Sequence, residues 1–152
     1  ATCLRILGDI FDFKTPQEQQ KALEKLMKND FILNANTSLI KFARNKDDIV
    51  LIDTLKQLCD VYVCTDDGSL GFKGNVIQFL NENNIQFDYY YSCGPLKMLE
   101  FLSKAYSNGC VSLEARMGCG FGACMGCSIQ TTKGPQRVCK EGPVFEATEV
   151  IY

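Results

Sequence analysis

The sequence contains no histidine and no tryptophan among its 152 residues. Without histidine the chain cannot form Ser-His or Cys-His catalytic pairs, histidine-ligated zinc sites or Rieske-type clusters, because each of these needs an imidazole nitrogen. The lack of tryptophan excludes a stacking site built on an indole ring. No apolar run approaches the roughly 20 residues that a membrane-spanning helix needs. These absences leave cysteine as the main soft metal ligand in the chain.

Excess charge of either sign is also missing. The chain has 16 basic and 18 acidic residues and a formal net charge of −2, so the charge balance predicts neither a nucleic-acid partner nor binding to an anionic membrane. Hydrophobic residues make up 46% and charged residues 22% of the chain, as in ordinary globular proteins. The start, ATCLRILGDI, has no basic leader followed by a long apolar segment, so we predict no signal peptide.

Cysteine, by contrast, is abundant, with nine residues and therefore an odd number. Five of them stand singly in apolar surroundings: Cys3, Cys59, Cys64, Cys93 and Cys110. This pattern is typical of buried thiols in a reducing compartment rather than of a disulfide framework, and it predicts a cytoplasmic protein. The other four cysteines gather near the C-terminal end.

Strand and helix patterns alternate as far as residue 110. Strands are predicted at residues 2–10, 60–65, 87–93 and 110–115, and residues 31–33 and 38–43 are predicted to form one or two more. Helices are predicted at residues 16–28, 46–58, from 75 to about 80, and 96–107. Such alternation implies crossover connections, and therefore an α/β fold with a mostly parallel sheet covered on both faces.

The pattern changes after residue 116, where glycine and cysteine become frequent and helix periodicity disappears. We therefore predict two parts: a nucleotide-binding-like domain at residues 1–110 and a small cysteine-rich β domain at residues 111–152. The second part is too short to build a useful apolar core of its own, so a metal centre is the expected source of its stability.

The stretch GCGFGACMGC at residues 118–127 carries three of the four clustered cysteines. Cys119, Cys124, Cys127 and Cys139 have the spacing Cys-x4-Cys-x2-Cys-x11-Cys, which is the plant-type [2Fe–2S] pattern. Glycines at positions 118, 120, 122 and 126 would let backbone amides approach the bridging sulfides, because no Cβ intervenes. The spacing predicts a [2Fe–2S] centre. The alternatives are a zinc site, although Cys139 lacks a nearby cysteine partner, and unligated thiols.

Two predicted strand ends carry further candidate residues. The sequence DDGS at residues 66–69 follows one strand, and CGP at residues 93–95 ends another. The carboxyl ends of parallel strands are where α/β sheets bind nucleotides, although both sequences are also common turn signals. Just before the cysteine stretch, Glu114 and Arg116 suggest an ion pair that orients it.

Three segments occur in the same order in one known family: DVYVCTDDGSLGFKG, YYSCGP and VSLEARMGCGFGACMGCSIQTTKGPQRVCKEGPVF. Over roughly residues 40–152 the chain resembles the electron-transfer subunits of NAD-dependent (B-type) dihydroorotate dehydrogenases, within the ferredoxin–NADP reductase superfamily. Small subunits of NADH-dependent ferredoxin–NADP oxidoreductases, sulfide dehydrogenases and some hydrogenases share this architecture.

The resemblance implies roles for particular residues. The cluster ligands correspond to Cys119, Cys124, Cys127 and Cys139. The nucleotide contacts correspond to a nicotinamide-side motif, a crevice loop and an adenosine-side pair: Cys93, Gly94 and Pro95; Asp66, Asp67, Gly68 and Ser69; and Arg44 and Asn45.

The resemblance also implies an electron path. In the family, electrons pass from a flavin in a partner subunit, through the cluster, to FAD and then as hydride to NAD⁺. It therefore implies an oxidoreductase component, not active alone, with [2Fe–2S], FAD and NAD as cofactors and a catalytic flavoprotein dehydrogenase as partner, most simply in the dihydroorotate oxidation of pyrimidine biosynthesis. The alternatives are a non-enzymatic iron–sulfur carrier or docking module, an electron-transfer subunit of a related ferredoxin–NADP oxidoreductase, sulfide dehydrogenase or hydrogenase, and a zinc-stabilised interaction domain.

The chain departs from the family in two places. It has neither the N-terminal FAD-binding β-barrel nor its Arg-Pro-x-Ser motif, and of the glycine-rich loop after the first strand only Gly8 remains. Asp9 and Asp12 would repel a pyrophosphate there, and Phe11 and Phe13 would block close approach. We therefore expect no FAD binding by this chain alone and weak dinucleotide binding. A C-terminal fragment of a longer subunit, or a short protein that kept only the cluster, would explain both departures.

Overall fold

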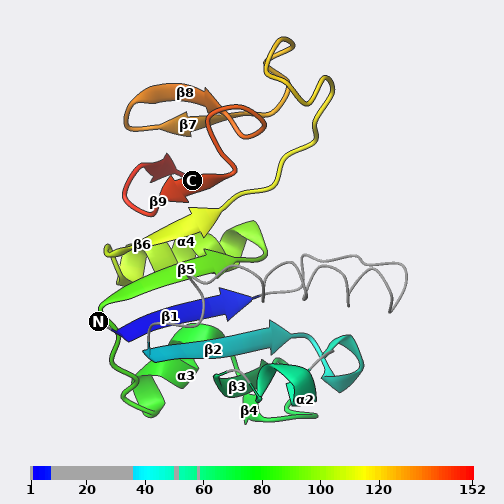
Figure 1. Ribbon diagram of the computed structural model, residues 1–152, viewed down its shortest axis with the longest axis vertical. Helices are drawn as coiled ribbons and strands as arrows, with labels where there is room; N and C mark the ends of the chain where they lie inside the picture. Colours follow the sequence, from blue (N-terminus) through cyan, green and yellow to red (C-terminus); the bar gives the residue numbers. More distant parts are fainter. Residues whose placement is uncertain (1, 8–35, 50–51, 58) are drawn as a thin grey trace.

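The computed structural model describes residues 2–7, 36–49, 52–57 and 59–152 (Figure 1). In this part of the chain seven strands form one sheet in the order β4-β3-β2-β1-β5-β6-β9. The strands are β1 Thr2–Leu7, β2 Asn36–Ala43, β3 Asp60–Thr65, β4 Phe72–Lys73, β5 Tyr89–Cys93, β6 Gly109–Ser112 and β9 Val144–Glu146. Every neighbouring pair from β4 to β6 is parallel, and only β9 runs antiparallel to its neighbour β6. The predicted α/β class with a mostly parallel sheet is confirmed.

The strand order reverses direction at β1. Strands β2 and β3 extend the sheet on one side of it, and β5 and β6 extend it on the other. The switch therefore lies between β1 and β5, where Leu7 is in register with Cys93 at the carboxyl ends of the two strands. A crevice outside such a switch point is where doubly wound sheets bind ligands, because the flanking connections leave in opposite directions.

The described helices are short: the 3₁₀ helix η2 Lys46–Asp48, and the α-helices α2 Ile52–Leu55, α3 Val76–Glu82 and α4 Leu96–Ala105. Asn75 caps α3 in a reciprocal arrangement with Gln78, in which each side chain accepts a hydrogen bond from the other residue's backbone amide. On α4, Leu99 and Leu102 are buried, whereas Leu96 in the first turn and Phe101 are exposed. The helix itself is confirmed, but the apolar face expected from Met98, Phe101, Leu102 and Ala105 is wrong in part, because Phe101 and Ala105 are exposed and Leu99 is buried instead.

The helix predicted at residues 46–58 is wrong in extent. The structure forms η2 there, and then Ile49 adopts an extended conformation that ends it before α2 begins. Local polar contacts favour the tight turn: the Asn45 side chain accepts from the Asp47 amide, and the Lys46 amide donates to the Ser69 hydroxyl at 2.7 Å. The helix predicted at residues 16–28 and the strand at 31–33 lie outside the described residues, and so does the coverage of the sheet's second face.

The C-terminal part adds an antiparallel sheet of three strands in the order β10-β7-β8. These strands are β7 Ser128–Thr131, β8 Gly134–Arg137 and β10 Val150–Ile151. Figure 1 places this small sheet beyond β9, at the edge of the large sheet, with the chain from β6 to β7 looping away from both. The β7–β8 hairpin has no counterpart among the predicted strands.

The two sheets share one apolar core. Val138, Phe145 and Ala147 from the C-terminal part are buried in the same cluster as Val111 of β6 and Leu102 of α4. The boundary predicted near residue 111 falls inside β6, and β9 from beyond that boundary completes the large sheet. The division into two domains stays a prediction. Across the described residues, no helix is long and apolar enough to cross a membrane.

Candidate metal centre

The stretch between β6 and β7 turns back on itself through glycine. Gly120 and Gly122 have φ angles of +73° and +90°, a left-handed conformation in which a side chain is strained. Met125 adopts a φ of +57° in the same loop although it is not glycine. These turns allow residues 119–127 to form a compact loop with Cys119 at its start and Cys127 at its end.

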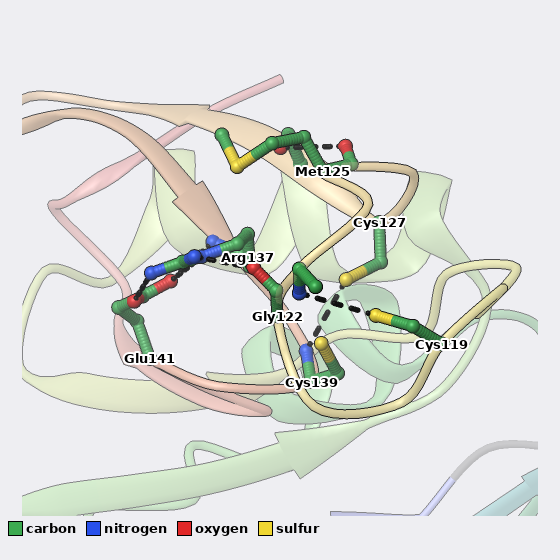
Figure 2. A network of polar contacts seen from close by, with 9 residues as sticks. Cys119, Gly122, Met125, Cys127, Arg137, Cys139 and Glu141 are labelled. Atoms are coloured by element: carbon green, nitrogen blue, oxygen red, sulfur yellow. Dashed lines mark hydrogen bonds and ion pairs between the residues drawn. The ribbon is translucent and has the colours of Figure 1, made fainter.

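The fourth cysteine reaches the loop through the hairpin. Ser128 of β7 is in register with Arg137 of β8, so the residues just outside the hairpin, Cys127 and Cys139, meet at its open end. The Val138 amide donates to the Cys127 carbonyl at 3.1 Å, and the Cys139 amide donates to Cys127 Sγ at 3.4 Å. Figure 2 shows the sulfur atoms of Cys119, Cys127 and Cys139 pointing toward one another. The eleven-residue spacing is therefore the length of this hairpin connection.

Backbone amides surround the sulfurs. Cys119 Sγ accepts from the amides of Ala123 at 3.2 Å and Cys124 at 3.5 Å, and Cys124 Sγ accepts from the amide of Gly126 at 3.4 Å. A Cβ atom built on Gly126 would lie only 3.4 Å from Cys124 Sγ, and one on Gly118 only 3.3 Å from it. The missing side chains thus leave space around this sulfur, while the approach of amides to bridging sulfides stays a prediction.

These contacts favour thiolates in part of the site. Donation from the backbone amides of Cys124 and Phe121 lowers the pKa of the Cys119 thiol to about 6. The backbone amide of Cys139 likewise lowers the pKa of the Cys127 thiol. The contact between the two thiols has the opposite effect on the other partner and raises the pKa of the Cys139 thiol. Because the thiolate is the form that binds a metal, these hydrogen bonds favour the metal-binding form of Cys119 and Cys127 even without a metal.

The donor set consists of four cysteine thiols, the ligands that a plant-type iron–sulfur cluster takes. In the described part of the chain, no group of three or more Cys, Asp or Glu side chains is arranged to hold one metal ion. A binuclear cluster makes a different demand, since its four thiolates divide between two irons and the bridging sulfides fill the space between them. The loop and the hairpin end offer four free thiols for such a cluster, and backbone amides are directed at three of the sulfurs.

Arg137 and Glu141 form an ion pair beside the loop that the sequence reasoning did not anticipate. Arg137 Nε and Nη2 both donate to the Glu141 carboxylate, the first at 3.0 Å, and Arg137 Nη1 donates to the carbonyl oxygen of Gly122. The pair lowers the pKa of Glu141 to about 2. The signal was present in the sequence as opposite charges four residues apart on either side of Cys139.

The ion pair suggested for Glu114 and Arg116 is wrong. These two described residues form no salt bridge with each other, and both are exposed. They lie on the extended segment after β6, where neighbouring side chains two residues apart share a face but have no partner element to hold them together. The charge pair that contacts the loop comes instead from β8 and the turn after it.

The candidate nucleotide residues lie at the carboxyl ends of three strands. The structure brings two of the groups together: the Asp66 and Asp67 amides donate to the carbonyls of Ala43 and Arg44, and the Ser69 hydroxyl accepts from the Lys46 amide. Asn45 caps η2 beside them. The turn at Asp66, Asp67, Gly68 and Ser69 and the pair Arg44 and Asn45 therefore form one continuous rim after β2 and β3.

Cys93, Gly94 and Pro95 stand apart from that rim, because β1 separates β5 from β2 in the sheet. They lie at the switch point, where β5 ends and α4 begins with Pro95 as its N-cap residue. No side chain caps the first amides of α4 in the described structure. Burial raises the pKa of the Cys93 thiol to about 11, so it is a neutral thiol near pH 7.

Comparison with known proteins agrees with this geometry. Residues 114–151, which include all four clustered cysteines, match the family model of the iron-sulfur cluster binding domain of dihydroorotate dehydrogenase B. The resemblance found in the sequence is confirmed. The match covers the loop, the hairpin and the strands β9 and β10 as one unit.

Relatives of known sequence extend the likeness toward the N-terminus. The chain is 42% identical over 113 residues to the electron transfer subunit of dihydroorotate dehydrogenase B (NAD(+)) from Streptococcus pneumoniae, and 43% identical over 121 residues to that from Fusobacterium nucleatum. These alignments cover 70% and 75% of this chain but only 45% and 47% of the relatives. The chain thus spans less than half the length of the curated relatives it matches.

A solved structure supports the fold over nearly the whole chain. The structure of an NADH-dependent reduced ferredoxin–NADP oxidoreductase, described in a study of flavin-based electron bifurcation, superposes with a TM-score of 0.77 at 24% sequence identity. The superposition covers 99% of this chain and 54% of that one. At this identity the likeness establishes the fold and not the activity.

Proposed function

We propose that this chain is part of an electron-transfer subunit that serves a flavoprotein dehydrogenase in NAD-dependent dihydroorotate oxidation. Residues 111–152 form its cluster-binding part, and residues 1–110 form a nucleotide-binding-like part. The observation that carries the proposal is that the loop at 119–127 and the end of the hairpin supply four free thiols, with backbone amides directed at three of the sulfurs. The relatives named above support the choice of dehydrogenase.

Cys119, Cys124, Cys127 and Cys139 are the proposed ligands of a [2Fe–2S] cluster. A bound cluster of this kind supplies one-electron transfer, which is why a flavin is needed before electrons can leave as hydride. The chain's own contribution is to hold the four thiolates in place and to offset their charge with amide hydrogens, as the Ala123 and Cys124 amides do at Cys119. Hydrogen bonds to cluster sulfurs are among the interactions that set a reduction potential.

The proposed nucleotide contacts follow from the switch point. Cys93, Gly94 and Pro95 take the nicotinamide side, where the uncapped first turn of α4 presents amide hydrogens to a polar group. The rim formed by Arg44, Asn45 and residues 66–69 takes the other end of a dinucleotide across β1. FAD belongs in this proposal to the intact subunit, together with NAD(H).

Metal analysis tests the cluster. Protein isolated without oxygen should contain two irons and two acid-labile sulfides per chain, because a binuclear centre holds two of each. It should be red-brown and should bleach when dithionite is added. A colourless protein with one zinc per chain and no iron would replace the proposal with a zinc-stabilised interaction domain.

Binding measurements test the electron-transfer role separately. Calorimetry with NADH should show saturable binding if the nucleotide part is functional, whereas no binding at millimolar concentration would favour a non-enzymatic iron–sulfur carrier. Co-purification with the intact subunit should yield a flavoprotein that oxidises dihydroorotate. Recovery of a flavoprotein with a different substrate would retain the cluster proposal and reject the dehydrogenase.

A further inference from the structure

The peptide group between Gly122 and Ala123 is held at both ends. Its carbonyl oxygen accepts a hydrogen bond from Arg137 Nη1, and its N–H donates to Cys119 Sγ at 3.2 Å (Figure 2). A trans peptide group is planar and rigid, with the carbonyl and the N–H on opposite sides. Fixing the oxygen therefore fixes the direction of the N–H.

Arg137 is itself fixed. Its Nε donates to Glu141 Oε2 at 3.0 Å and its Nη2 donates to Glu141 Oε1, so the planar guanidinium is held in a two-pronged ion pair. The Arg137 backbone amide also donates to Glu141 Oε2, at 2.7 Å. The third guanidinium nitrogen is left in a defined position, directed at the loop.

The loop offers this nitrogen an opening because residue 122 is glycine. Gly122 is buried, and a Cβ atom built there would lie 3.3 Å from Arg137 Nη1 and 2.7 Å from the Lys140 side chain. Its φ of +90° is also a conformation that side chains avoid. A residue other than glycine would push the guanidinium away from the carbonyl.

We propose that Arg137, held by Glu141, is a positioning residue that aims the Ala123 amide at the Cys119 sulfur and thereby raises the reduction potential of the cluster. The inference rests on the proposed [2Fe–2S] function. A hydrogen bond from a cation to the carbonyl also polarises the peptide and strengthens its N–H as a donor. A stronger donor stabilises the more negative, reduced state of the centre.

Arg137→Lys separates orientation from charge. Lysine keeps the positive charge but lacks the planar fork that holds Glu141 and the Gly122 carbonyl at once. We expect redox titration of the cluster-loaded variant to show a lower reduction potential. At a fixed applied potential, the ratio of reduced to oxidised cluster should fall about tenfold, which for one electron corresponds to a decrease of ~59 mV. The exchangeable-proton coupling at the reduced cluster, measured by electron–nuclear double resonance in D₂O, should weaken in the same variant.

Lys133→Gln is the matched control. Lys133 lies on the turn of the same hairpin and pairs with Glu149, so this variant removes a cation without touching the loop. In this variant the ratio of reduced to oxidised cluster, at the same applied potential, should change by less than about twofold, because an exposed charge is screened by salt. A variant isolated without cluster is reconstituted anaerobically before titration. Failure of Arg137→Lys to take up a cluster even after reconstitution, where Lys133→Gln succeeds, would assign Arg137 to the folding of the loop and overturn the role in setting the potential.

The outcomes distinguish this inference from the proposed function. A wild-type protein that holds no [2Fe–2S] cluster would overturn both. A cluster-containing wild type whose potential and proton coupling are unchanged in Arg137→Lys would overturn the positioning role alone. The positioning role is likewise overturned if Lys133→Gln lowers the potential as much as Arg137→Lys does, because a shift of that size would then not be specific to the contact between Arg137 and the Gly122 carbonyl.

Discussion

The parallel sheet and the cysteine loop differ in what surrounds their side chains. In the sheet, Ile40, Tyr90 and Val111 are fully buried among other apolar groups. In the loop, Met117, Phe121 and Met125 are at least half exposed, and Phe121 is 71% exposed. The sheet is therefore held by apolar burial, while the loop depends on sulfur–amide contacts, glycine turns and the Arg137 ion pair. A segment of the second kind needs its metal to remain ordered.

The largest expected effect comes from removing the remote ligand. Cys139→Ser should abolish the cluster and the order of residues 117–140, since this thiol closes the site at the end of the hairpin. Iron and sulfide content, visible absorption and limited proteolysis would measure both losses. The control Cys59→Ser, whose thiol lies outside the site, should keep its colour. A coloured, protease-resistant Cys139→Ser protein would contradict the ligand assignment.

A substitution in the apolar core should lower the stability of the fold but leave the cluster in place, unlike the loss of a cluster ligand. Leu102→Ala on α4 removes a side chain with 0% exposure and should lower the free energy of unfolding by about 2–5 kcal/mol, through lost burial and the cavity left behind. Iron content measured below the unfolding transition should stay at the wild-type level. Leu96→Ala on the same helix, at a residue 60% exposed, should change stability by less than about 0.5 kcal/mol. Equal losses in the two variants would argue against this packing of α4.

Two glycines, one beside the sheet and one in the loop, have similar backbone angles but different surroundings. A Cβ atom on Gly71 would lie 2.2 Å from the Val63 carbonyl oxygen in the sheet, whereas one on Gly120 in the loop would have no atom within 4 Å. Both have left-handed φ angles, +70° and +73°. Gly71→Ala should therefore cost roughly 2–5 kcal/mol of stability, and Gly120→Ala only about 1–2 kcal/mol. Urea unfolding would test the order, and a larger loss for Gly120→Ala would contradict it.

The smallest effect concerns alkaline pH. Burial raises the pKa of the Cys64 thiol on β3 from 9.0 to about 12. Because the unfolded chain then loses this proton first, the stability contribution is complete below about pH 9 and decreases as the pH rises toward about 12. Urea midpoints at about pH 8 and about pH 10 should differ less in Cys64→Ala than in the wild type. An equal pH dependence in both proteins would refute this account.

Sequence patterns predicted the strands and helices whose own residues favour that secondary structure. Residues 60–65 form β3 as predicted, since an apolar, β-branched run suits a buried strand, and Asn75 begins α3 because its side chain can cap the helix. The β7–β8 hairpin could not be predicted in this way. Its strands are short, β8 contains Pro135, and they pair because β10 and the loop hold them in place.

The candidate metal centre divides in the same manner. The four cysteines and their spacing are a property of the sequence, because ligand type and separation suffice to suggest a cluster. Neither Arg137 nor Glu141 could be assigned to the site from spacing, since their contact with Gly122 depends on how the hairpin folds against the loop. Glu114 and Arg116, closer to the loop in sequence, do not contact each other.

The candidate ligand set, the α/β class and the glycines of the loop could all be predicted from the sequence, because each follows from local chemistry: soft donors, apolar periodicity and backbone freedom. Three features become visible only in the tertiary structure. β9 joins the large sheet, Cys93 lies at the switch point beside β1, and Arg137 contacts the peptide group that faces Cys119. These features depend on contacts between segments far apart in the chain, and such contacts leave no periodic pattern in the sequence.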